Sequence, residues 1–194
     1  MKHLIVFAHP NPKSFNRAIL DTYTGALKES GHEVRIRDLY AMDFPPVLSA
    51  DDLAGVSQGK IAKEVREEQQ HVAWADRITF IYPLWWCGMP AIAKGYIDRV
   101  FAEGFAYAFD ANGLKKLLTG KQVMTIVTLG DSEENYRNKG FFAAMDQLMD
   151  GVTFEFPGLT VVGHKYFGSV PIASDADRKR MLSEVRNWGH TTKP

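Results

Sequence analysis

The feature that most constrains the fold is a short, unbroken apolar run at residues 4–8, which ends in His-Pro-Asn-Pro at residues 9–12. An apolar run without polar alternation is typical of a strand buried on both faces, as in a parallel sheet covered by helices. From Ser14 the apolar spacing becomes helical, and Gly31 is placed to end that helix. Strand, loop and helix therefore follow one another at the start of the chain.

The same alternation repeats along the rest of the sequence. Further strands are predicted at residues 33–37, 78–82, 123–127 and 159–162, and further helices at residues 61–72, 90–100, 141–149 and 174–188. Five strands alternating with helices predict an α/β fold with one doubly wound parallel sheet and helices on both faces. We expect a single domain over residues 1–194.

Composition argues against several classes of protein. The 23 basic and 23 acidic residues give no net charge, whereas a nucleic-acid partner calls for a basic excess. Cys87 is the single cysteine, so we expect no disulfide framework, no cysteine-bound zinc and no other metal. The apolar start is too short for a signal peptide and no run reaches the roughly 18 residues of a membrane span, so we expect a cytoplasmic protein.

Loops at residues 9–16, 83–90 and 128–136 follow predicted strands, and in a parallel sheet such loops meet at one edge. Ligands of doubly wound sheets bind at that edge, so these loops are the candidate site. The glycine-rich motifs of nucleotide sites and the motifs of serine hydrolases and zinc proteases are absent from the sequence. Nucleotide hydrolysis, ester hydrolysis and zinc proteolysis therefore lose their best support.

The first loop leads into a helix N-terminus, where free N–H groups and the helix dipole favour an anion such as phosphate. Ser14 and Asn16 add donors, and His9 or Lys13 adds a cation. The alternative is a plain helix cap on a proline-stiffened turn, and this loop alone leaves both open.

The second and third loops point to a planar ligand. Trp85 and Trp86 lie in a loop that is expected at the surface, where large apolar groups indicate either packing on a neighbouring element or a pocket for a flat ring. Cys87 has no neighbouring base and is interpreted as a small apolar contact. In the third loop, N–H groups around Gly130 are suited to stabilising negative charge on a bound ring, with a polar surface loop as the alternative.

The residues of these loops also carry a family resemblance. They read Ala8-His9-Pro10 and Ser14-Phe15-Asn16, then Pro83-Leu84-Trp85-Trp86 with Gly88, Pro90 and Ala91, followed by Lys94-Gly95, Arg99-Val100-Phe101 and Phe105-Ala106-Tyr107. This pattern resembles the NAD(P)H:quinone oxidoreductase family, the DT-diaphorase-like flavoproteins with a flavodoxin-like fold. The resemblance spans nearly the whole chain.

The resemblance implies a role for each matching residue. It assigns His9, Ser14, Phe15 and Asn16 to the flavin phosphates, Pro83, Leu84, Trp85, Trp86 and Cys87 to the length of the isoalloxazine ring, and Thr128, Leu129, Gly130 and Asp131 to its pyrimidine edge. Tyr136 matches the tyrosine that supports the reduced flavin, and Tyr107 and Phe109 match aromatic residues on the substrate side. Tyr136, Gly130 and Trp86 are thus the expected catalytic residues.

The implied activity is that of an NAD(P)H dehydrogenase (quinone). Hydride passes from NADH or NADPH to the flavin, and two electrons then pass to a quinone or similar acceptor by ping-pong kinetics in a homodimer. Closeness to FAD-binding members at residues 83–107 favours FAD slightly over FMN, whereas the short C-terminus favours FMN. Asp131 replaces a glycine that is common in the family, and Phe142 replaces a histidine of the mammalian enzymes.

Two other functions fit the same features. A flavodoxin-type electron carrier would bind flavin without a nicotinamide pocket, although carriers usually present a charged face. An ancillary regulator of a potassium efflux system would bind a membrane transporter as its partner.

Overall fold

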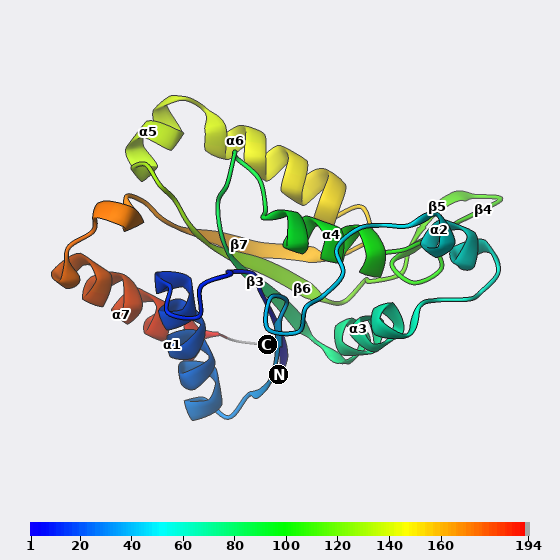
Figure 1. The fold of residues 1–194 in the computed structure, drawn as a ribbon, viewed down its shortest axis with the longest axis horizontal. Helices are drawn as coiled ribbons and strands as arrows, with labels where there is room; N and C mark the ends of the chain where they lie inside the picture. Colours follow the sequence, from blue (N-terminus) through cyan, green and yellow to red (C-terminus); the bar gives the residue numbers. More distant parts are fainter. Residues whose placement is uncertain (193–194) are drawn as a thin grey trace.

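The structure is a computed structural model that describes residues 1–192, and it contains the predicted sheet (Figure 1). The five strands have the order β2-β1-β3-β6-β7, and all neighbours are parallel. They are β1 (Lys2–Phe7), β2 (Glu33–Asp38), β3 (Arg77–Pro83), β6 (Gln122–Thr128) and β7 (Thr160–Phe167). The doubly wound parallel sheet predicted from the sequence is therefore confirmed.

Helices cover both faces of this sheet (Figure 1). One face carries α1 (Phe15–Glu29) and α7 (Asp175–Thr191), and the other carries α3 (Lys63–Trp74), α4 (Ala91–Val100) and α6 (Phe141–Asp146). A Cβ at Gly189 of α7 would lie 2.5 Å from the Cβ of Ala26 in α1. Glycine at this position therefore lets these two helices approach closely.

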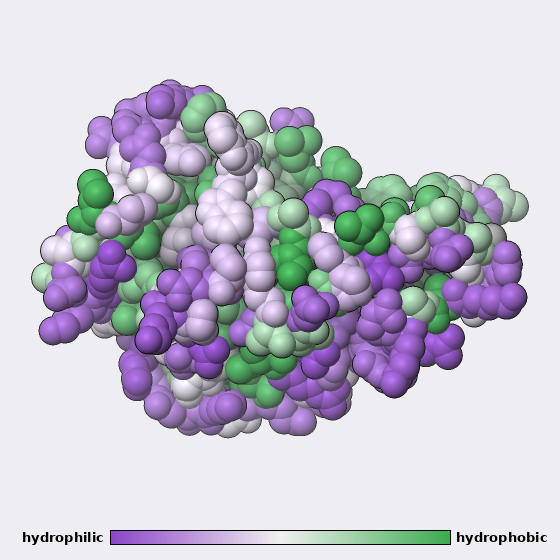
Figure 2. Space-filling model, in the orientation of Figure 1, coloured by the Kyte–Doolittle hydropathy of each residue, from purple (hydrophilic) through white to green (hydrophobic). Residues whose placement is uncertain are grey.

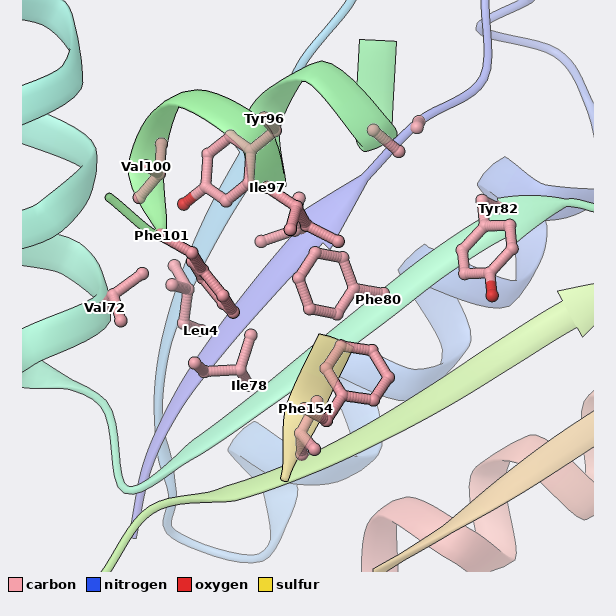
Figure 3. Close-up of a cluster of buried hydrophobic side chains, with 14 of the residues drawn as sticks. Leu4, Val72, Ile78, Phe80, Tyr82, Tyr96, Ile97, Val100, Phe101 and Phe154 are labelled. Atoms are coloured by element: carbon pink, nitrogen blue, oxygen red, sulfur yellow. The ribbon is translucent and has the colours of Figure 1, made fainter. Parts of the chain in front are cut away.

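The core on the α4 face is built around aromatic rings (Figure 3). Phe80 of β3 packs against Tyr96 of α4 at 6.4 Å and stacks on Phe154 at 5.7 Å, measured between ring centroids. Every residue of β3 is buried, as the unbroken apolar run predicts for a central strand. This rigid centre holds the carboxyl ends of β1, β3 and β6 side by side.

Several elements differ from the sequence prediction. The structure adds a hairpin of β4 (Tyr107–Asp110) and β5 (Gly113–Lys116), and it adds α2 (Ala50–Ser57) and α5 (Glu133–Asn138). The hairpin strands have four residues each, too few for a period-two pattern to stand out. The helix predicted at 141–149 continues from α6 into the π-helical η1 (Gln147–Phe154).

Strand β7 extends beyond the predicted residues 159–162. Gly163 adopts a φ of 143° at a register shift opposite Val123 and Met124, so the strand bulges and continues where the sequence pattern indicated a break. Among residues 1–192, no helix is long and apolar enough to cross a bilayer, and no group of three or more His, Cys, Asp or Glu side chains is placed to hold a metal ion.

Hydrophilic and hydrophobic residues are interspersed on the face seen in Figure 2, and hydrophobic groups also occupy the projection at its right, which carries α2 and the hairpin. Leu53 of α2 and Phe109 of β4 are among the exposed apolar side chains of this projection. The projection lies at the opposite end of the molecule from α5 and α7 (Figure 1).

Candidate active site

The three predicted loops converge on a pocket of about 290 Å³ at the carboxyl ends of β1, β3 and β6, here called the strand-end pocket. It is lined by His9, Phe15, Asn16, Pro83, Leu84, Trp85, Thr128, Leu129, Gly130, Val170, Pro171 and Arg178. Backbone bonds lock the loops together: Leu84 N donates to Thr128 O at 2.8 Å, and Leu129 N donates to Phe167 O at 2.8 Å. The pocket walls are therefore fixed by the sheet itself.

The first loop is a capped helix start. Ser14 Oγ accepts a bond from Arg17 N at 3.2 Å, and Asn11 N donates to His9 Nδ1 at 3.0 Å. Burial lowers the pKa of His9 below its usual value. Lys13 is exposed and does not line the pocket.

Asn16 is the buried polar group of the pocket. Its Nδ2 donates to Thr128 Oγ1 at 2.8 Å, while its Oδ1 has no hydrogen-bond partner within residues 1–192. A buried acceptor left unpaired costs about 1–3 kcal/mol. Asn16 thus offers an acceptor to an N–H or O–H group of a ligand in the pocket.

Arg178, which was not predicted from the sequence, places a positive charge in the pocket wall. Its Nη2 donates to Val170 O at 2.9 Å and its Nε to Ala173 O at 3.3 Å, which folds the side chain back from α7 over Phe15. A capping box of Ser174 and Asp177 begins α7 and aims its first turn at the pocket. No spacing pattern marks Arg178 in the sequence, because its place depends on the loop after β7.

The second loop is a tight turn closed by two bonds between Trp85 and Gly88, at 3.1 and 3.0 Å. The turn residues Trp86 and Cys87 both have positive φ, 52° and 56°, a conformation that costs side-chain-bearing residues free energy and clusters at functional sites. Trp85 lines the pocket, whereas Trp86 is fully exposed. Trp86 therefore does not pack on a neighbouring element of its own chain, which was the alternative to a ligand pocket.

The third loop places Gly130 in the pocket wall, next to Asp131, which does not itself line the pocket. The Asp131 carboxylate accepts bonds from Asn135 Nδ2 at 2.9 Å and Ser132 N at 2.7 Å, and these bonds lower its pKa. Tyr136, on α5, is partly buried. Burial, and then its contact with the Cys87 thiol of the second loop, raise the pKa of the Tyr136 hydroxyl.

One group of predicted residues lies elsewhere. Tyr107 and Phe109 are on the hairpin, with ring centroids 5.9 Å apart, and Phe109 is exposed. Neither lines the strand-end pocket, nor do Ser14, Trp86, Cys87, Asp131 and Tyr136. One chain therefore brings together nine predicted residues in the pocket wall, and the hairpin aromatics lie at the far end of the molecule (Figure 1).

Comparisons with known proteins agree with this geometry. The model of the family described as "Flavodoxin-like fold" matches residues 1–188. An uncharacterized NAD(P)H oxidoreductase of Haemophilus influenzae is 38% identical over 94% of this chain and 91% of its own length. Human ribosyldihydronicotinamide dehydrogenase [quinone] is 33% identical over 94% of this chain and 87% of its own length.

Similar solved structures point to the same family. An NAD(P)H:quinone oxidoreductase from Methanothermobacter marburgensis superposes with a TM-score of 0.91 at 32% identity, over 100% of this chain and 99% of that one. An FMN-dependent NADH-azoreductase from Bacillus anthracis, in complex with FMN, shares the fold alone, with a TM-score of 0.74 at 17% identity over 97% of each chain. The chain therefore belongs to the flavodoxin-like family of NAD(P)H:quinone oxidoreductases.

Proposed function

We propose that this chain is a flavin-dependent NAD(P)H dehydrogenase (quinone) whose flavin occupies the strand-end pocket. The observation that carries the proposal is the unpaired, buried Oδ1 of Asn16 in a pocket that also holds the Arg178 guanidinium. When bound, a flavin supplies two-electron chemistry between NAD(P)H and a quinone. The relatives' names describe oxidoreductases, which favours this activity over an electron carrier or a transporter regulator.

The residues of the pocket fit a flavin in two parts. Arg178 and the first turn of α1 bind the phosphate, because a cation and a helix N-terminus both favour an anion. Asn16 and Thr128 meet polar groups of the ligand at the pocket floor. Leu84 and Trp85 form a flat apolar wall suited to an aromatic ring. His9, Ser14, Phe15, Pro83, Cys87, Leu129 and Asp131 complete the proposed cofactor contacts.

Catalysis by these residues is orientation and charge stabilisation. With a flavin bound, N–H groups around Gly130 and the Tyr136 hydroxyl would donate hydrogen bonds to one edge of the ring and stabilise negative charge there. Trp86 stacks on the reactants and aligns them. The pocket would admit the donor and the acceptor in turn, which gives ping-pong kinetics, and its walls would exclude water.

A second copy of the chain completes the site in this proposal. Phe109 and Trp86 are exposed, and Tyr107 lies on the same hairpin, far from the pocket of its own chain (Figure 1). Pairing in a homodimer covers these aromatic side chains and brings a hairpin over the neighbouring pocket as its substrate-side wall. Light scattering of active protein should give twice the mass of one chain, and the mass of a single chain would contradict the dimer.

We propose FAD rather than FMN, on the resemblance of residues 83–107 to FAD-binding relatives. The test is a mass spectrum of the cofactor released by heat from purified protein, together with its absorbance. FAD at one equivalent per chain is the expected result. FMN would correct the choice of flavin alone, whereas a colourless supernatant would contradict the proposed function.

A further inference from the structure

Four aromatic rings from three different elements form a column beside the strand-end pocket. In order they are Tyr136 of α5, Phe142 of α6, and Tyr166 and His164 of β7. Successive ring centroids lie 5.6, 4.3 and 6.0 Å apart, and successive ring planes are inclined by 29°, 27° and 24°. The column therefore joins the third loop to the edge strand β7 by ring-on-ring contacts.

Polar bonds fix the inner end of the column. The Tyr166 hydroxyl donates to Asp146 Oδ1 at 2.9 Å. Both nitrogens of His164 are engaged, Nδ1 with Thr125 Oγ1 at 2.8 Å and Nε2 with Asp150 Oδ1 at 2.9 Å. Thr125 is buried in β6, and a ring bonded on both sides cannot rotate without breaking a bond. The two β7 rings are thus held rigidly.

The helix that supplies the carboxylates changes its winding here. Asp146 is the last residue of α6, and Asp150 lies in the π-helical η1 that follows. Both carboxylates reach His164 Nε2, at 3.9 Å for Asp146 and 2.9 Å for Asp150. π-helical turns are rare and occur frequently at functional sites. Here the π-helical turn and the end of α6 attach the segment that carries Phe142 to strand β7.

We infer that this column positions Tyr136, with Tyr166 as the residue that sets the position of Phe142 and, through it, of Tyr136. Phe142 offers Tyr136 a ring face but no hydrogen bond, so stacking orients the Tyr136 ring. Phe141 supports the same ring edge-on at 5.6 Å. The inference rests on the proposed function, in which Tyr136 acts on the flavin.

The test compares Tyr166→Phe in two backgrounds. This change keeps the ring and removes only the hydroxyl that Asp146 accepts. In the flavin-loaded protein we expect reduction by NAD(P)H to slow about threefold, with flavin affinity unchanged. In a Tyr136→Phe background the same change should have no further effect, because Tyr166 acts through the Tyr136 hydroxyl. Equal slowing in both backgrounds, or none in either, would overturn the inference.

Matched variants on α6 and η1 separate positioning from folding. Asp146→Asn keeps an oxygen that accepts from Tyr166 and should behave as the wild type, whereas Asp146→Ala should reproduce Tyr166→Phe. Leu148→Ala changes an exposed side chain of the same segment and should leave the rate unchanged. Slowing by Leu148→Ala equal to that by Asp146→Ala would assign the effect to the stability of the segment and overturn the inference.

A second readout needs no flavin. Fluorotyrosine placed at position 136 should give one narrow fluorine resonance in the flavin-free protein, and Tyr166→Phe should broaden or shift it. An unchanged resonance would mean that Tyr136 is oriented without the column. If the wild type binds flavin but NAD(P)H does not reduce it, the proposed function fails, and the fluorine spectra still decide whether the column positions Tyr136.

Discussion

The two ends of the parallel sheet each bury polar atoms without partners, yet only one end has the other parts of a binding site. At the carboxyl end, the free Oδ1 of Asn16 lies in a pocket with Arg178. At the amino end, His3 is fully buried and neither ring nitrogen has a hydrogen-bond partner within residues 1–192. The charged groups near His3 are Arg77, the N-terminus and Asp76, and the His32 ring lies 4.9 Å away.

The volume of the hollow at each end does not explain the difference between the two ends of the sheet. A hollow of about 350 Å³ at the amino end is larger than the strand-end pocket of about 290 Å³, but His3 is not among its lining residues. The carboxyl end differs in its helix N-terminus and its converging loops, and its unpaired atom belongs to a residue that lines the pocket. An unpaired buried atom therefore indicates a ligand only where a pocket and converging polar groups accompany it. Sealed from solvent, such an atom instead reduces stability.

The largest expected effect is acid destabilisation through His3. Burial first, and then the charges of His32, Arg77 and the N-terminus, lower the pKa of His3 from its ordinary 6.5 to about 4, although Asp76 opposes them. Between pH 6.5 and about 4, the unfolded chain therefore binds a proton on His3 that the folded chain does not bind. Stability is lost as pH falls, by about 3 kcal/mol over the full span and about 2 kcal/mol between pH 7 and 5.

Urea unfolding of the wild type and of His3→Leu at both pH values isolates this contribution from that of the other titrating groups. His3→Leu should lose about 2 kcal/mol less than the wild type between pH 7 and 5. Equal losses would show that His3 does not titrate in this way, and the contrast between the two ends of the sheet would then need another explanation.

The next effect concerns the cation at the carboxyl end. Arg178→Ala should weaken flavin binding about thirtyfold, because it removes a charge-assisted hydrogen bond to the phosphate worth about 2 kcal/mol. Lys179→Ala removes a charge of the same sign from an exposed neighbour on α7 and serves as the control. Fluorescence titration of flavin-free protein measures both. Equal weakening by the two variants would point to a general charge effect and against a phosphate contact.

Trp86 tests whether the exposed turn acts in the reaction. Trp86→Ala should lower turnover about tenfold, since loss of one stacking ring costs about 1 to 2 kcal/mol. Because Trp86 is fully exposed in the chain, the free energy of unfolding should change by less than about 0.5 kcal/mol. Trp86→Phe, which keeps a ring, should recover most of the activity. A large fall in Tm with normal specific activity would contradict a role in stacking.

An effect of about the same size, confined to flavin reduction, is expected at Tyr136. Tyr136→Phe removes a donor that acts only as charge appears, so flavin reduction should slow about tenfold while flavin affinity stays nearly constant. Phe142, the neighbouring ring, has no proton to donate in its place. Stopped-flow reduction is the measurement. An unchanged rate would mean that the backbone N–H groups around Gly130 are enough to stabilise the charge, without a side-chain donor at the carboxyl end.

The parts that the sequence predicts well are those with local causes. The apolar run of β1 and the glycine and proline residues around the loops are visible without any tertiary contact, so the sheet and the converging loops follow from the sequence. Arg178, Asp146 and His164 act through contacts between distant segments, and no spacing rule marks them. The hairpin carrying Tyr107 was missed because its short strands pair with each other outside the main sheet.

The central claim is that the carboxyl end of the sheet holds a flavin that passes electrons from NAD(P)H to a quinone. Anaerobic titration of purified protein with NADPH and with NADH, followed by addition of a quinone, tests it directly by flavin absorbance. We expect one flavin per chain, bleached by one equivalent of at least one donor and restored by one equivalent of quinone. Protein without flavin absorbance, or bound flavin that neither donor reduces, would contradict the account.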